Sequence, residues 1–312
     1  MKRSSRRILT PLARSMVGRV AEEVPGVELV EIPGSGPIPP EAQGEILLTT
    51  VLARNFEEAV KRGVRWVHTY GTGIERFPFD VIGDRLLTCS RGASAIPISE
   101  WVLATMLAAA KRLPESWIHE APEGWSRAEL DGLYGRTLGL IGIGGIGLAT
   151  ARRALAFGMR VRALRRKPVP SPLPEVELAS DLHDLLGSSD HLVVAAPATG
   201  ETRHLLDAEA FAHMKPGVHL VNIARGQIID QDALREALDS GHVSLASLDV
   251  CDPEPLPAGH WLYTHPRVRL SPHISWSMPG SSEYLLDPFI ANLRRYLAGE
   301  PLIDPVDVEA GY

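Results

Sequence analysis

The chain has 312 residues, more than one domain of ordinary size requires, so we expect two domains with separate hydrophobic cores. A hydrophobic fraction of 45% and a charged fraction of 22% are ordinary for a globular protein, and a formal net charge of −6 gives no support for a nucleic-acid partner. The start lacks the apolar core of a secretory signal, and no stretch is long and apolar enough for a membrane span, so we expect a cytoplasmic protein with no membrane partner. Two cysteines, Cys89 and Cys251, cannot build a disulfide framework, and no histidine motif has metal-ligand spacing, so we expect no metal site.

Short apolar runs alternate with helical patterns over the first hundred residues, as in an open α/β sheet. A second pattern starts with residues 99–111, which we expect to form a helix with Ser99 as its N-cap. Because this helix is apolar over most of its circumference, we expect it to form the contact of a homodimer. The strands expected before it are 7–10, 27–32, 45–49, 66–69 and 86–89, and the helices are 13–24 and 55–63.

An apolar strand pattern, a glycine-rich turn and an Ala- and Leu-rich helix pattern follow one another over residues 137–158. The turn has the spacing G-x-G-x-x-G. Here Gly142 allows a tight turn, Gly144 lets the backbone approach a pyrophosphate, and Gly147 lets the helix pack closely on its strand. The unpaired N–H groups at the helix start then face an anion. The segment therefore predicts a dinucleotide-binding domain.

Further apolar runs after the glycine turn supply the strands of a doubly wound parallel sheet. The helical pattern at 283–299 follows the last of them and most simply returns to the first domain, which makes that domain discontinuous. We therefore predict an α/β protein. A doubly wound, parallel-sheet dinucleotide-binding domain occupies 97–279, and a smaller flavodoxin-like α/β substrate domain occupies 1–96 and 280–312. The later strands are expected at 159–164, 190–195, 218–222, 244–249 and 267–270, and a helix is expected at 232–240.

The residues after the second strand of the dinucleotide domain bear on the choice of cofactor. NAD-binding domains usually carry an acidic residue there, about 20 positions beyond the glycines, which accepts hydrogen bonds from the ribose. This chain has Arg165, Arg166 and Lys167 instead. Because guanidinium groups pair well with a 2′-phosphate, we expect NADPH to be the preferred cofactor, with NADH as the alternative.

Three polar residues stand just past expected strand ends, each near glycine or proline: Arg225, Glu254 and His273. Ligands of a doubly wound sheet bind outside these ends. Reduction of a 2-oxo acid needs an anion clamp, which Arg225 offers, and a proton donor at the carbonyl oxygen, for which His273 is the candidate. A neighbouring Glu254 would orient the imidazole and keep His273 ready to donate a proton. We therefore expect these three residues to be catalytic, with Arg225 and His273 also binding the substrate.

The motifs around these residues resemble the D-isomer-specific 2-hydroxyacid dehydrogenase family, and within it the glyoxylate/hydroxypyruvate reductase branch. The resemblance runs from about Trp66 to the C-terminus. The motifs that carry it lie at 70–74, 97–100, 142–147, 196–203, 214–217, 222–226, 248–250, 254–257 and 271–273.

The resemblance implies residue roles beyond the three catalytic ones. It implies that Asp249 binds the nicotinamide carboxamide and that backbone N–H groups around Thr72 and Gly73 hold the substrate carboxylate. The expected partner is therefore a small 2-oxo or 2-hydroxy acid. The expected cofactor-binding residues are Gly142, Gly144, Gly145, Ile146, Gly147, Arg165, Arg166, Pro197, Thr202, Ala224 and Asp249.

Other functions fit parts of the same pattern. The segment 90–97 is closer to the glyoxylate/hydroxypyruvate reductase branch than to D-3-phosphoglycerate dehydrogenase, whose activity stays an alternative. A nucleotide-sensing corepressor on the same fold also stays open, because the three polar residues suit both. A formate dehydrogenase-like activity fits less well, since those relatives pair the histidine with an amide where this chain has Glu254. A methyltransferase on a similar fold would explain the glycines but not the three later residues.

Overall fold

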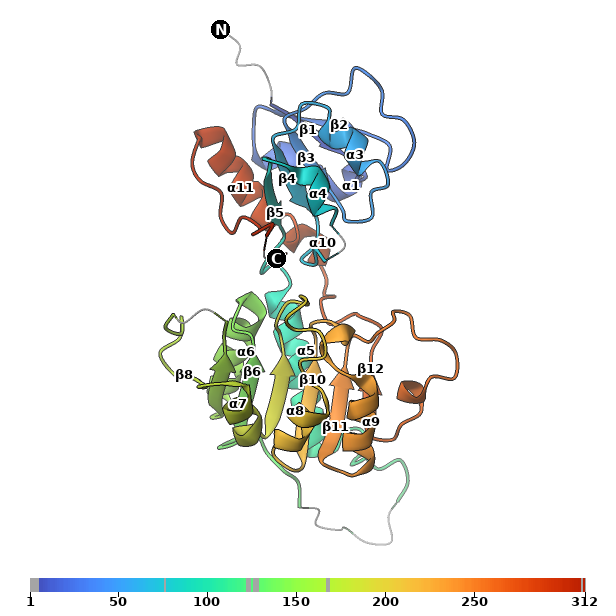
Figure 1. The fold of residues 1–312 in the computed structure, drawn as a ribbon, viewed down its shortest axis with the longest axis vertical. Helices are drawn as coiled ribbons and strands as arrows, with labels where there is room; N and C mark the ends of the chain where they lie inside the picture. The colour runs from blue at the N-terminus through green and yellow to red at the C-terminus, as the bar shows by residue number, and fades with distance from the viewer. Residues whose placement is uncertain are drawn as a thin grey trace. The chain divides into compact units, whose positions relative to one another are not determined.

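The computed structural model describes residues 6–75, 77–121, 125, 129–166, 169–309 and 311. The chain divides into two compact units, one of Met1–Ser94 with Met278–Tyr312 and the other of Ala95–Ser277. It therefore passes between the units after Ser94 and after Ser277, whereas the sequence placed these passages after residues 96 and 279. Each unit contains one parallel sheet (Figure 1). Every helix in the described ranges is too short or too polar to pass through a bilayer.

The sheet of the first unit has five parallel strands in the order β2-β1-β3-β4-β5, which is the order of flavodoxin-like folds. Two expected helices are each divided in two. The helix expected at 13–24 is divided at Gly18, and the one expected at 283–299 is divided before Pro288, which lies in the first turn of α11. The strands are β1 (Arg6–Thr10), β2 (Val27–Glu31), β3 (Ile46–Thr49), β4 (Trp66–Thr69) and β5 (Leu86–Cys89). The helices are α1 (Arg14–Val17), α2 (Arg19–Glu23), α3 (Phe56–Val60), α4 (Phe79–Ile82), α10 (Ser281–Tyr284) and α11 (Asp287–Ala298).

Helix α11, close to the carboxyl terminus, packs beside β4 and β5 of the first unit (Figure 1). Its Phe289 is fully buried and stacks on Trp66 of β4, with the two ring centroids 5.2 Å apart. Trp66 in turn donates its indole N–H to Thr88 Oγ1 of β5 at 2.9 Å. The core of this unit is therefore built from residues near both ends of the sequence.

The sheet of the second unit has seven parallel strands in the order β12-β11-β10-β9-β6-β7-β8. Counted from its own first strand, this order is 3-2-1-4-5-6-7, the doubly wound order of a Rossmann domain. The winding reverses at β6, which lies between β7 and β9. The strands are β6 (Thr137–Ile141), β7 (Arg160–Leu164), β8 (Val176–Leu178), β9 (His191–Val194), β10 (Val218–Asn222), β11 (Val243–Leu248) and β12 (Val268–Leu270). The helices are α5 (Ala95–Lys111), α6 (Gly145–Ala156), α7 (Leu182–Ser188), α8 (Ala208–His213) and α9 (Gln231–Asp239), with 3-10 turns η1 (Gly226–Ile228) and η2 (Trp261–Tyr263).

Helices cover both faces of this sheet (Figure 1). One face carries α5 and α6, which bury Val102 and Ala151 against the strands. The other face carries α7, α8 and α9, which bury Leu185, Phe211 and Leu234. Because both faces are covered, the loops at the strand ends are left to carry the polar chemistry.

Helix α5 differs from its prediction at the amino end. It begins at Ala95, so the prediction that Ser99 is the N-cap is wrong. Ser99 lies inside the helix, fully buried, and donates its hydroxyl to the Ile96 carbonyl at 2.8 Å. Pro97 is tolerated ahead of it because the N–H that proline lacks has no partner in the first turn of a helix. Much of the apolar surface of α5 packs on α6 within the same unit.

Three buried histidines make the stability of the fold depend on pH. Burial lowers the pKa of His68 to about 3, of His219 to about 3 and of His191 to about 4. In the unfolded chain each titrates near pH 6.5. The unfolded state therefore binds more protons below about pH 6.5, so the contribution of these histidines to stability is complete above that pH. It is lost as the pH falls toward the folded-state pKa values.

We expect the free energy of unfolding to fall steadily between pH 7 and pH 5. His219→Gln removes one group that takes up a proton on unfolding. The free energy of unfolding of this variant should therefore change less steeply with pH than that of the unaltered protein, by up to about 1.4 kcal/mol per pH unit. Urea unfolding at a series of pH values measures both slopes. Ser247→Ala is the control, because it removes the hydroxyl 3.0 Å from His219 Nε2 without removing a titrating group. An identical slope for His219→Gln and the unaltered protein would contradict the assignment.

Candidate active site

The glycine-rich turn joins β6 to α6 at the point where the winding of the sheet reverses. Gly142 has a φ of 98°, and a Cβ there would lie 2.9 Å from backbone atoms of Ala195 and Ala196, at the end of β9. A Cβ on Gly147 would lie 2.4 Å from the carbonyl oxygen of Gly142. Both positions therefore exclude any larger residue, and the turn is held tightly against the carboxyl end of its own strand and of β9.

Helix α6 presents its amino end to the space beyond this turn. Gly144 is its N-cap and a Cβ there would meet nothing within 4 Å, so the backbone is open on that side. The first turn, which includes Gly145 and Ile146, carries no acidic side chain. Unpaired N–H groups and the helix dipole favour an anion at this position. The turn thus fits the pyrophosphate of a dinucleotide.

Two further loops flank this space at the same edge of the sheet. At the end of β7, Arg165 donates through Nη1 to the carbonyl oxygens of Val169 (3.1 Å) and Pro170 (2.7 Å), so it braces the loop that follows. Arg166 is exposed, and Lys167 lies outside the described residues. After β9, the hydroxyl of Thr202 donates to the Pro197 carbonyl at 2.8 Å and so closes the 197–202 loop.

Arg225 stands in a fixed turn after β10. The amide of Asn222, the last residue of the strand, donates to the Arg225 carbonyl at 3.0 Å, and its oxygen accepts from the N–H of Ala224 at 3.0 Å. A Cβ on Gly226 would lie 2.0 Å from the carbonyl carbon of Cys251, so this turn packs directly on the segment after β11. Sequence reasoning missed Asn222. The signal that could have found it is an amide side chain at the end of an otherwise apolar, fully buried strand.

Glu254 and His273 form a direct pair. His273 Nδ1 lies 2.9 Å from Glu254 Oε2, and the other carboxylate oxygen accepts the N–H of Cys251 at 3.1 Å. An ionised carboxylate can only accept, so Nδ1 carries a proton and Nε2 is the ring atom left to exchange a proton with a substrate. Burial and the nearby Glu254 raise the pKa of the Cys251 thiol to about 11. The thiol therefore stays protonated at neutral pH and is not a nucleophile.

The buried carboxylate of Asp249 holds the loop that carries His273. One oxygen accepts from Ser271 Oγ at 2.5 Å and from the N–H of Ile274 at 2.8 Å, and the other accepts from the N–H of Ser275 at 2.9 Å. The Asp249 carbonyl also accepts the N–H of His273 at 2.9 Å. His273 itself has a φ of 55°, an uncommon conformation for a residue with a side chain. Both oxygens of Asp249 are thus engaged with this loop.

Thr72 and Gly73 belong to the other unit, where they follow β4. Thr72 is exposed, and the preceding Gly71 has a φ of 134° and donates its N–H to Ser90 Oγ at 3.2 Å. This turn lies at the carboxyl end of its own sheet, where backbone N–H groups can meet an anion.

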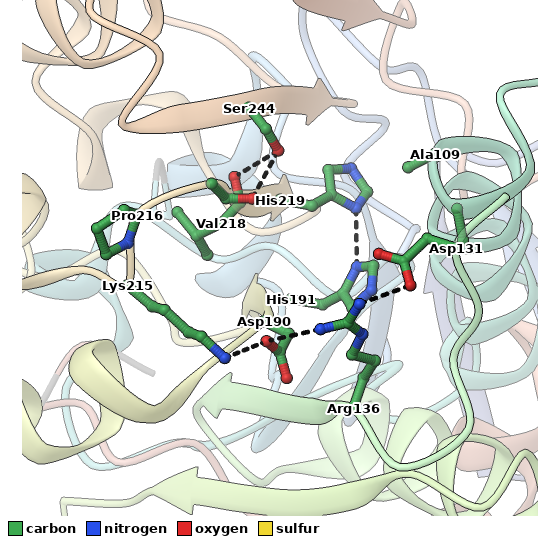
Figure 2. A pocket seen from close by; sticks show the side chains of 12 residues that line it. Ala109, Asp131, Arg136, Asp190, His191, Lys215, Pro216, Val218, His219 and Ser244 are labelled. Atoms are coloured by element: carbon green, nitrogen blue, oxygen red, sulfur yellow. Dashed lines mark hydrogen bonds and ion pairs between the residues drawn. The ribbon is translucent and has the colours of Figure 1, made fainter. Parts of the chain in front are cut away.

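The structure also has a cavity of about 220 Å³ at the opposite, amino-terminal edge of the second sheet (Figure 2). Its charges are paired with one another: Arg136 with Asp131 at 2.7 Å, and Lys215 with Asp190 at 2.5 Å. His191 and the buried His219 also line the cavity, and their Nδ1 atoms lie 3.1 Å apart. Because the glycine turn, Arg225 and the Glu254–His273 pair all lie at strand carboxyl ends, this cavity is not part of the candidate site.

The comparison with known proteins supplies the family. A family model described as D-isomer specific 2-hydroxyacid dehydrogenase, NAD binding domain, matches residues 103–275. The chain belongs to this family. The family resemblance and the α/β architecture expected from the sequence are therefore confirmed, and the second unit is the NAD-binding domain of this family, with the strand order of a Rossmann fold.

The relatives of this chain carry different names. This chain is 34% identical over 281 residues to D-3-phosphoglycerate dehydrogenase of Mycobacterium bovis. The matched region covers 87% of this chain and 52% of that protein. It is 32% identical over 245 residues to glyoxylate reductase of Thermofilum pendens. The matched region covers 75% of this chain and 72% of that protein. The chain thus spans about half the length of the D-3-phosphoglycerate dehydrogenase.

A solved structure agrees with this family membership over the whole chain. It is the D-isomer specific 2-hydroxyacid dehydrogenase of Xanthobacter autotrophicus Py2 in complex with NADPH and MES. The TM-score is 0.85 at 27% sequence identity, and the match covers 99% of this chain and 100% of that one.

Asp249→Asn is expected to lower NAD(P)H-dependent turnover by about 10- to 100-fold, because an amide nitrogen in place of one oxygen would face an N–H donor of the His273 loop. Steady-state kinetics measures the loss, and the NADPH dissociation constant shows whether cofactor binding changes as well. Asp232→Asn, an exposed aspartate on α9 of the same unit, is the matched control and should behave as the unaltered protein. Unchanged turnover in Asp249→Asn would show that the carboxylate does not position His273.

Proposed function

We propose that the chain is an NAD(P)H-dependent reductase of small 2-oxo acids, of the glyoxylate and hydroxypyruvate type, that forms the D-2-hydroxy acid. The observation that carries the proposal is the His273–Glu254 pair, 2.9 Å apart, on a segment that packs against the turn of Arg225. An imidazole held by a carboxylate, together with the guanidinium of Arg225, is the donor set that reduction of a 2-oxo acid requires. The relative from Thermofilum pendens is named glyoxylate reductase, which supports the substrate class.

Each residue then has a role in the proposed reaction. A nicotinamide cofactor held at the turn of Gly142, Gly144 and Gly147 would supply the hydride for the reduction. Arg225 binds the substrate carboxylate in a bidentate manner and polarises the adjacent carbonyl. His273 donates the proton on Nε2 to the carbonyl oxygen in the reductive direction and removes it in the oxidative one, while Glu254 keeps the Nδ1 proton in place. The family resemblance also assigns substrate binding to the N–H groups near Thr72 and Gly73, in the first unit.

His273→Ala and Arg225→Ala should each lower turnover by about 100-fold or more, because they remove the proton donor and the anion clamp. NADPH binding should remain close to that of the unaltered protein, since the glycine turn is untouched. NADPH oxidation followed by absorbance, with fluorescence titration of NADPH, tests both statements. His119→Ala, an exposed histidine of the same unit, serves as the control. Ordinary turnover in either active-site variant would refute its assigned role.

The choice of substrate separates the remaining alternatives. The curated relatives named D-3-phosphoglycerate dehydrogenase favour a second candidate function, oxidation of 3-phosphoglycerate. A panel of glyoxylate, hydroxypyruvate and bulkier 2-oxo acids with NADPH, and 3-phosphoglycerate with NADP⁺ and NAD⁺, distinguishes the two. If none of these substrates is turned over while the cofactor still binds, the result would favour a nucleotide-sensing protein instead.

We also propose that NADPH is preferred over NADH. The support is the arginine pair at the end of β7, where an NAD-binding domain usually carries an acidic residue: Arg165 donates to the carbonyl oxygens of Val169 and Pro170, and Arg166 is exposed. The solved relative from Xanthobacter autotrophicus is in complex with NADPH, which agrees with this proposal.

Replacing Arg165 and Arg166 together by serine should lower kcat/KM for NADPH by about tenfold or more, because two charged contacts to a 2′-phosphate are lost. The value for NADH should change little, because NADH lacks that phosphate. Arg160→Ser, at the amino end of the same strand, is the control. Equal efficiency of the unaltered protein with both cofactors would overturn the preference.

The remaining proposal concerns assembly. We propose a homodimer through α5, whose Trp101 and Leu107 are only partly buried within their own unit. Two large apolar residues just beyond the helix, Trp117 and Ile118, are 62% and 58% exposed. Burial of these side chains between two copies would be favourable. Molar mass measured by light scattering should be that of two chains.

A further inference from the structure

Two histidines and a glutamate gather on the outer surface of the second unit, away from the residues assigned above. His183 lies on α7, and Glu209 and His213 lie on α8. These two helices are neighbours on one face of the sheet, as Figure 1 shows. All three side chains are exposed, and their ligand atoms lie within 4.8 Å of one another. We propose that they form a three-ligand site for a divalent transition-metal ion such as Zn²⁺, with water completing the coordination.

The backbone holds this group in place. Each helix start is capped by an aspartate: Asp181 accepts the N–H of Asp184 at 2.8 Å, and Asp207 accepts the N–H of Ala210 at 2.9 Å. On their inner sides both helices contribute to one buried apolar cluster. Their outer faces are therefore fixed relative to one another, and Glu209 and His213, four positions apart, share one side of α8.

A second observation points to a ligand. His213 Nδ1 lies 2.8 Å from the Glu209 carbonyl oxygen. A carbonyl oxygen only accepts, so Nδ1 carries a proton and the lone pair of the ring is on Nε2. Metal-binding histidines commonly donate their other ring N–H to a backbone carbonyl in this way, which orients the ring. His213 is thus set in the tautomer that a metal ion needs.

The two imidazole rings are stacked, with centroids 3.8 Å apart and planes 4° from parallel. An ion lies in the plane of each imidazole that binds it, and two parallel planes cannot both contain it. Binding must therefore turn at least one ring out of the stack. Zn–N bonds of about 2.0 Å also require the nitrogen atoms to approach to about 3.3 Å.

The donor set selects the kind of ion. Two imidazole nitrogens and one carboxylate oxygen suit Zn²⁺ and its neighbours in the first transition series. Mg²⁺ and Ca²⁺ prefer sites made of oxygen alone. An ion at this place would link α7 to α8 and stabilise their packing. It would have no part in the proposed reduction, because none of its ligands belongs to the candidate active site.

Calorimetric titration of the chelator-treated, dialysed 312-residue chain with ZnCl₂ tests the proposal. We expect one saturable site per chain and a higher Tm with Zn²⁺ than with Mg²⁺. His183→Ala, Glu209→Gln and His213→Ala should each weaken Zn²⁺ binding at least tenfold, and His119→Ala, an exposed histidine elsewhere in the unit, should not.

Two further measurements keep the outcome unambiguous. Circular dichroism checks that the variants fold, which is expected because the three side chains are exposed. NADPH-dependent turnover of the metal-free variants should equal that of the unaltered protein, so failure of the proposed enzymatic activity would leave the metal result unaffected. Absence of saturable Zn²⁺ binding, or normal binding in any of the three variants, would overturn the site.

Discussion

The candidate site depends on the hydrogen bonds that the buried carboxylate of Asp249 accepts. An ionised group out of contact with water is costly unless donors surround it, and here two backbone N–H groups and one hydroxyl do so. All three donors come from residues 271–275, so satisfying the charge also fixes the loop. The left-handed backbone of His273 is held as a consequence, and its ring then meets Glu254 at 2.9 Å.

Arg225 is tied to the same centre by packing. Gly226 leaves no room between its own backbone and that of Cys251, and the N–H of Cys251 bonds to Glu254. The three polar residues therefore belong to segments in contact, although they lie far apart in the sequence. Such preorganisation lets donors act on developing charge without rearrangement during the reaction. The loops that follow strands β10, β11 and β12 thus carry the groups of the proposed chemistry.

Much of the architecture could be predicted from the sequence because strong local signals coincide with the fold. The G-x-G-x-x-G turn and the long apolar runs identified the strands of the second unit, since a strand buried on both faces has to be apolar throughout. The Glu254–His273 pair was expected from residue types near strand ends. The weak signals failed: β8, α7 and α8 are short and polar on one side, so their patterns did not stand out. Ser99 misled because a serine before an apolar run resembles an N-cap, although its hydroxyl bonds back to Ile96 inside the helix.

Other contacts across separate elements could not be predicted from spacing. The donors that Asp249 engages follow a different strand, and His183 meets His213 only because two helices pack side by side. A single sequence holds no record of such pairing, and the roles proposed for these residues rest on the geometry instead.

The stacking of Phe289 on Trp66 has a consequence for how the chain acquires its structure. The Rossmann unit is one uninterrupted stretch, inserted between the two parts of the flavodoxin-like unit. During synthesis from the amino terminus, the inserted unit is complete before α11 has been made. Until α11 is made, the cluster that contains Trp66 lacks Phe289, Ile290 and Leu293, so this apolar part of the flavodoxin-like sheet stays incompletely covered. The domain that starts first in the sequence is thus the last to finish folding, and a chain truncated ahead of α11 would expose an apolar sheet surface prone to aggregation.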